Sequence, residues 1–170
     1  LDVQGTTFAP QGNITKKGSI VSNVAASSST IFQMAEVAAL CNDAQLAFDA
    51  KSGTYSNVGE PTEGALRVLV EKIGTQDAAQ NQKRAGAAAQ DCLHLSSSWY
   101  EARAPRLATY EFSRDRKSMS VLVGSKNQQK LLVKGAPESI IDRCTHTLVG
   151  ANGKKVPMTK ALTDLLLREV

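Results

Sequence analysis

Three strand-like segments joined by short links restrict the fold of this chain more than any other feature. They cover residues 107–112, 118–123 and 129–133 and are rich in branched, apolar and aromatic side chains. The links contain turn-forming residues, at Asp115-Arg116 and at Ser125-Lys126-Asn127. Consecutive strands with such links are typical of an antiparallel meander, which we expect here.

Helices are expected before and after this meander. Residues 31–40 form an apolar helix that follows a run of Ser and Thr suited to N-capping. A second helix begins at Pro61, a favoured first helical residue, and ends before Gly74. Between them, residues 46–49 and 54–58 predict a hairpin.

The remaining elements are shorter. We expect helices at 91–100 and 137–144, a strand at 145–149, and a last helix capped by Thr159. The last helix has an apolar stripe predicted to be buried, formed by Leu162, Leu165 and Leu166. Because strands and helices are segregated along the chain, the predicted class is α+β, with an antiparallel sheet flanked by helices.

Residues 75–90 are rich in Ala, Gln and Gly and form a low-complexity segment. The pattern leaves a helix, a mobile loop and a combination of the two as alternatives. We expect this segment to be an insertion without chemistry of its own.

Composition limits the function classes. With 170 residues, 42% of them hydrophobic, the chain fits one folded domain, residues 1–170. The net charge of +4 is spread along the chain, with no basic run longer than two residues, which argues against a nucleic-acid partner. No apolar run approaches the ~20 residues that span a bilayer, so we expect no membrane insertion.

The cysteines and histidines do not form a recognisable metal or disulfide pattern. Cys41, Cys92 and Cys144 are odd in number and unpaired in spacing, while His94 and His146 are isolated. We therefore expect no metal site, and we interpret these residues as packing or surface positions in a reducing compartment.

Two segments of the second half concentrate cations beside an aromatic ring or bare backbone. Phe112 ends a strand and is followed by Arg114, Arg116 and Lys117. It lies two residues after Tyr110, which predicts that both rings share a face. An aromatic ring at a strand end can stack on a flat base, although a core phenylalanine is the plain alternative.

Lys134 and Gly135 directly follow the third predicted strand and precede a helix that starts at Pro137. The ammonium can reach into a pocket or simply extend to solvent along the strand end. Gly135 leaves room for a close backbone approach. Earlier in the chain, Glu63 can accept a hydrogen bond from the adenine amino group or can serve the helix dipole, and Thr62 can cap or contact a ligand.

Several motifs, in this order, together resemble the nucleotide-binding domain of P-type ATPases. The motifs are Cys41-Asn42-Asp43, Gly59-Glu60-Pro61-Thr62-Glu63-Gly64-Ala65-Leu66, Phe112-Ser113-Arg114-Asp115-Arg116-Lys117-Ser118-Met119-Ser120, and Lys134-Gly135-Ala136-Pro137-Glu138 followed by Ile141-Asp142-Arg143-Cys144. The Lys-Gly-Ala-Pro-Glu motif is shared by several pump classes. The second and third motifs resemble the sarco/endoplasmic-reticulum-type calcium pumps most closely. The resemblance covers almost the whole chain and fades at residues 75–90.

The resemblance implies a binding site for ATP or ADP, held as Mg-ATP in a complete pump. It implies that Phe112 stacks on adenine and that Glu63 lies near the amino edge, with Thr62 beside it. It also implies that Lys117 and Lys134 line the pocket, that Arg114 lies toward the phosphates, and that Gly135 and Ala136 form part of the wall.

The Asp-Lys-Thr-Gly-Thr phosphorylation motif of such pumps is absent from this sequence. We therefore expect no catalytic residue here, and a fragment of a larger pump that binds nucleotide without turnover. Its partners would be the phosphorylation and actuator domains of the parent chain, on the cytosolic face of the endoplasmic reticulum. The alternative is a nucleotide-free regulatory or interaction module with the same fold.

Overall fold

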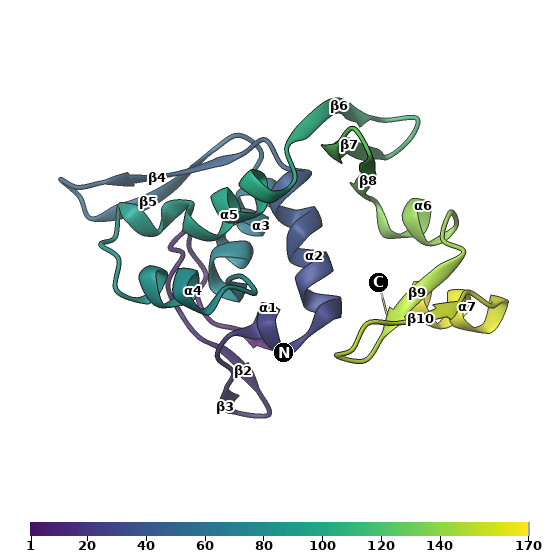
Figure 1. The fold of residues 1–170 in the computed structure, drawn as a ribbon, viewed down its shortest axis with the longest axis horizontal. Helices are drawn as coiled ribbons and strands as arrows, with labels where there is room; N and C mark the ends of the chain where they lie inside the picture. Colours follow the sequence, from purple (N-terminus) through teal and green to yellow (C-terminus); the bar gives the residue numbers. More distant parts are fainter. Residues whose placement is uncertain (170) are drawn as a thin grey trace.

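The computed structural model describes residues 1–169 and has an antiparallel sheet beside a group of helices (Figure 1). The sheet contains β6 (Arg106–Ser113), β7 (Ser118–Ser125) and β8 (Gln128–Gly135), in the order β6-β7-β8. Both pairings are antiparallel, which confirms the predicted meander. The principal helices are α2 (Ser29–Leu40), α3 (Pro61–Ile73) and α5 (Leu95–Arg103).

The main core lies where the central strand β7 meets the helices. Val121 and Val123 of β7 are fully buried, in one cluster with three alanines of α2 and with Val70 and Ile73 of α3. Tyr100 of α5 joins this cluster, and its hydroxyl donates to the carbonyl of Gly74 at 3.1 Å. Tyr100 therefore anchors α5 to the core.

The other strands form three small antiparallel sheets. They are β1 (Asp2–Val3), β2 (Ile14–Lys16) and β3 (Ser19–Ile20); β4 (Gln45–Asp49) and β5 (Thr54–Val58); and β9 (His146–Val149) and β10 (Lys154–Pro157). The β4–β5 hairpin is the predicted one. The α+β class is confirmed, with the strands of residues 1–169 divided among four sheets.

The short helices refine several expected boundaries. They are α1 (Val24–Ser27), α4 (Ala78–Ala85), the 3-10 turn η1 (Asp91–Leu93), α6 (Pro137–Ile141) and α7 (Lys160–Arg168). Helix α4 covers half of the low-complexity segment. The Asp77 carboxylate caps its start by accepting hydrogen bonds from amides of the first turn. Helix α6 is shorter than the predicted 137–144. Within residues 1–169, no helix has both the length and the apolar character needed to cross a bilayer.

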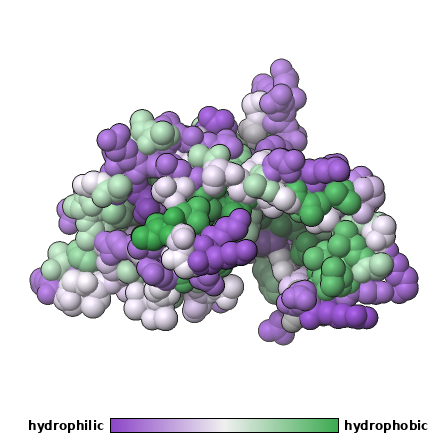
Figure 2. Space-filling view, turned by 90° about the horizontal axis from the view of Figure 1, so that it is seen from below, coloured by the Kyte–Doolittle hydropathy of each residue, from purple (hydrophilic) through white to green (hydrophobic). Residues whose placement is uncertain are grey.

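The predicted burial of the α7 stripe is wrong. Leu165 is 54% exposed, and Leu162 and Leu166 are only half-buried. The reason is that α7 packs mainly on the short helix α6, so that one side of the stripe lacks a partner within residues 1–169. Figure 2 shows apolar side chains gathered at this end of the molecule, over the C-terminal elements.

The turn of the β9–β10 hairpin lies at the beginning of α2 (Figure 1). The Ser29 amide donates to the carbonyl of Ala151 at 2.7 Å, and the Thr30 hydroxyl donates to the carbonyl of Gly150 at 2.6 Å. These two hydrogen bonds attach the C-terminal hairpin to the helical part of the molecule.

Glu71, on α3, is a fully buried carboxylate that fixes the start of α5. Its two oxygens accept hydrogen bonds from the amides of Ser96 and Ser97 at 2.8 and 2.9 Å, and from the Ser97 hydroxyl at 2.9 Å. The carboxylate thus satisfies amides in the first turn of α5 that have no partner within the helix.

We predict that Glu71→Ala lowers the free energy of unfolding by about 1.5–3 kcal/mol, because these amides become buried without an acceptor. Urea denaturation of the variant and the parent measures this difference. Glu111→Ala, at an exposed position, is the control and should change stability little. Equal stability of Glu71→Ala and the control would contradict the assigned role.

Candidate functional site

A cleft of ≈ 520 Å³ lies where the start of α3 faces the ends of β6 and β8. It is lined by nine residues: Glu60, Thr62, Glu63, Leu66, Phe112, Met119, Lys134, Gly135 and Ala136. Six of the eight residues predicted from the sequence therefore meet in one place, although they come from three distant segments of the chain.

Phe112 is an exposed aromatic ring at one wall of this cleft. It is 64% exposed, which excludes the alternative of a core phenylalanine. Tyr110 is also exposed, yet it does not line the cleft. The pairing of β6 with β7 shifts register between Tyr110 and Ser113, and such a bulge redirects side chains that simple alternation would place together.

Lys134 and Glu63 form an ion pair across the cleft. Their side chains are only 20% and 18% exposed, so Lys134 does not merely extend to solvent. The other Glu63 oxygen accepts a hydrogen bond from the Asp43 amide at 2.8 Å. Burial alone would raise the pKa of Glu63, but the hydrogen bonds from Lys134 and the Asp43 amide outweigh it and lower that pKa.

The turn after α2 holds Glu63 in place through the buried side chain of Asn42. The Asn42 amide nitrogen donates to the carbonyls of Ala38 and Glu63, at 3.1 and 2.9 Å. Its amide oxygen accepts from the Ala44 amide at 2.9 Å. One side chain thereby joins the end of α2, the start of α3 and the approach to β4.

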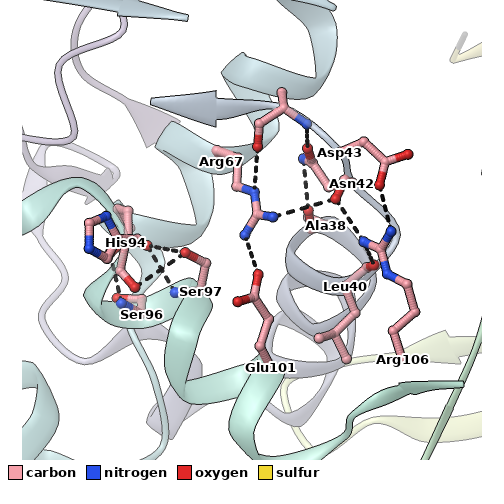
Figure 3. Close-up of polar contacts among 12 residues, drawn as sticks. Ala38, Leu40, Asn42, Asp43, Arg67, His94, Ser96, Ser97, Glu101 and Arg106 are labelled. Carbon is pink, nitrogen blue, oxygen red and sulfur yellow. Dashed lines mark hydrogen bonds and ion pairs between the residues drawn. The ribbon is translucent and has the colours of Figure 1, made fainter. Parts of the chain in front are cut away.

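Two arginines converge on the same turn, as Figure 3 shows. Arg67 of α3 donates to the carbonyls of Ala44 and Asn42, and it pairs with Glu101 at 2.8 Å. Arg106 of β6 donates to the carbonyls of Leu40 and Asn42, and it pairs with Asp43. The turn that supports Glu63 is therefore fastened to both α3 and the sheet.

Arg114 and Lys117 lie outside the lining of the cleft, on the exposed turn between β6 and β7. Lys117 pairs with Glu138 at 3.4 Å, and both side chains are more than half exposed. The structure therefore does not bring these two cations together with the six residues of the cleft.

Gly135 permits a close backbone approach, but the approaching backbone belongs to the neighbouring strand. A Cβ atom at this position would lie 2.3 Å from the carbonyl oxygen of Lys117. Gly135 therefore allows β8 to pair tightly with the start of β7, where its Cα partner is Ser118.

Sequence reasoning missed three lining residues and the internal ion pair. Leu66 lies within the predicted helix that begins at Pro61, and Met119 and Glu60 occur only as members of motifs. The apolar or acidic character of these three side chains does not by itself indicate that they line a cleft. The helical spacing of Glu63 and Leu66 was the one available indication that both side chains share a side of α3.

The α+β fold and the motifs around this cleft point to the P-type ATPases as a class. The family model described as "P-type ATPase, cytoplasmic domain N" matches residues 30–170, and the chain belongs to this family. Over all 170 residues it is 62% identical to "Endoplasmic reticulum calcium ATPase srcA" of Aspergillus fumigatus, of which it covers 18%. It is 37% identical over 164 residues, 94% of this chain, to "Calcium-transporting ATPase 3, endoplasmic reticulum-type" of Arabidopsis thaliana, of which the match covers 16%. The chain thus spans less than a fifth of either relative.

We predict that the charge of Glu63 stabilises the folded chain at neutral pH and that this contribution is lost in acid. Because folding lowers the pKa of Glu63, the stabilisation is present above the ordinary glutamate pKa and disappears as the pH falls through the folded value. The stability difference between the parent and Glu63→Gln, measured by urea denaturation, should shrink as the pH is lowered.

Lys134→Met provides the matched test, because it removes the partner and keeps the apolar stem. The pKa of Glu63, followed by NMR, should rise in this variant. A stability difference that is independent of pH, together with an unchanged Glu63 pKa, would contradict the prediction.

Proposed function

We propose that the Phe112 cleft binds the adenine nucleotides ATP and ADP, and that the chain is the nucleotide-binding domain of a calcium-transporting P-type ATPase. The observation that carries this proposal is the gathering of an exposed ring, an apolar floor and a paired lysine in one cleft. Membership of the family supports it.

The size and chemistry of the cleft suit a nucleotide base. Its volume of ≈ 520 Å³ falls within the roughly 300–1,000 Å³ usual for small-molecule sites. Leu66 and Met119 supply apolar surface, and Phe112 supplies a ring face for stacking. Glu63 and Thr62 supply polar groups at one side, where an adenine amino group could be recognised.

The phosphates would extend toward cations. Lys134 lies in the cleft, where its ammonium, paired with Glu63, can also donate a hydrogen bond to the bound nucleotide. Arg114 and Lys117, both exposed, are the further cations that we propose for the phosphates. Because those two are in solvent, their contribution is screened by salt, and we expect modest affinity.

In the complete pump the domain would present Mg-ATP to a separate phosphorylation domain. Phosphoryl transfer requires a positioned acceptor, and this sequence lacks the phosphorylation motif. The names of both relatives support calcium as the transported ion and the endoplasmic reticulum as the membrane. We further propose that the domain lies on the cytosolic face, with the phosphorylation and actuator domains as partners, and that alone it binds nucleotide without turnover.

Phe112→Ala should weaken ATP binding by about 1–3 kcal/mol, the usual loss when an aromatic ring that stacks on a base is removed. Isothermal titration calorimetry with ATP, ADP and GTP measures the loss and the base preference. Tyr110→Ala is the matched control, because Tyr110 is an exposed ring on the same strand outside the cleft. Equal affinity of Phe112→Ala and the parent would refute the assignment of the pocket.

Lys134→Ala should weaken ATP binding about tenfold, as expected when one charge-assisted hydrogen bond is lost. The control is Lys130→Ala, on the same strand, where the lysine pairs with Glu36 at 3.1 Å and does not line the cleft. If ATP affinity is unchanged while the pKa of Glu63 rises, Lys134 serves Glu63 alone and does not contact nucleotide.

A further inference from the structure

Lys72, in the last turn of α3, is a buried cation without a carboxylate partner among residues 1–169. Only 8% of the residue is exposed, and its ammonium donates to the carbonyl of Gln4. None of the ion pairs within these residues includes it. Burial lowers the pKa of Lys72, which expresses the cost of removing an ammonium from water.

Arg84, in the last turn of α4, lines the same cavity as Lys72. The only hydrogen bond of its guanidinium within residues 1–169 runs from Nη1 to the carbonyl of Pro10, at 3.4 Å. A guanidinium group has five N–H donors in a fixed plane, so most of the donors of Arg84 remain available. Like Lys72, it has no acidic partner in the described part of the chain.

The cavity that both residues line is small and lacks acidic groups. Its volume of ≈ 210 Å³ is below the roughly 300 Å³ at which sites for drug-sized molecules begin. No aspartate or glutamate lines it, whereas Asn23 and Asn81 add neutral amides. Lys72 also lines a neighbouring cleft of ≈ 370 Å³, which likewise has no acidic lining residue.

We propose that Lys72 and Arg84 form a binding site for a small tetrahedral oxyanion of the phosphate or sulfate class. Two cations from different helices would approach the ion from two sides, with the planar guanidinium making paired hydrogen bonds to two of its oxygens. The anion would supply the counter-charge that the buried ammonium lacks. The site shares no lining residue with the Phe112 cleft and is independent of it.

Titration of the ¹⁵N-labelled 170-residue chain with inorganic phosphate tests this proposal, with sodium chloride adjusted to keep the ionic strength constant. We expect saturable chemical-shift changes at the amides of Gly74, Asn23 and Ala85, which border the cavity. Arg84→Gln should weaken the phosphate affinity about tenfold or more. Lys83→Gln is the matched control, because it removes one exposed charge beside the cavity and should leave the affinity unchanged.

Lys72→Met removes the second cation while keeping the length of the stem, and a folded variant should also lose phosphate binding. Arg84→Gln keeps the test decisive if Lys72→Met does not fold. Linear shifts without saturation, or equal effects of Arg84→Gln and Lys83→Gln, would indicate a general salt effect and overturn the proposal. Loss of the phosphate response in Phe112→Ala would assign the ion to the other cleft and overturn it as well.

Discussion

The side chain of Asn42 is the interaction on which the arrangement of the site depends. It is almost fully buried and uses both amide atoms, so that the end of α2, the start of α3 and the approach to β4 meet at one residue. Neither an aspartate nor an aliphatic residue could supply two donors and an acceptor here. Because the cleft is assembled from distant segments, this fixed junction keeps their side chains in place relative to one another.

The charged groups around this junction are arranged so that each has a specific partner. Arg67 and Arg106 neutralise the carbonyl-rich turn, and each also meets a carboxylate at its outer edge. Inside the cleft, Lys134 and Glu63 are partly desolvated and satisfy one another. Buried charges are tolerated when they are paired and hydrogen-bonded, and the cleft can therefore hold ionic groups without unfolding the region.

Local patterns predicted the elements well, while contacts between distant elements could not be predicted from the residues alone. The meander, the β4–β5 hairpin and the bounds of α3 follow from turn chemistry, Pro61 and Gly74, each of which acts within a few residues. The Lys134–Glu63 pair joins residues 71 positions apart, and no spacing rule encodes it. The predicted burial of the apolar stripe of α7 is wrong for a related reason. Periodicity shows which face of a helix is apolar, but it does not show whether another element covers that face.

The attachment of the β9–β10 turn to α2 has a consequence for local stability. The Thr30–Gly150 hydrogen bond closes a loop of 120 residues, whereas the hairpin itself is held by neighbouring strands. Contacts of such long sequence separation are costly to close and tend to form after local structure. None of the residues that line the Phe112 cleft belongs to β9, β10 or α7. We infer that the C-terminal hairpin can open locally while the cleft keeps its shape. The free energy of this local opening would be lower than that of global unfolding.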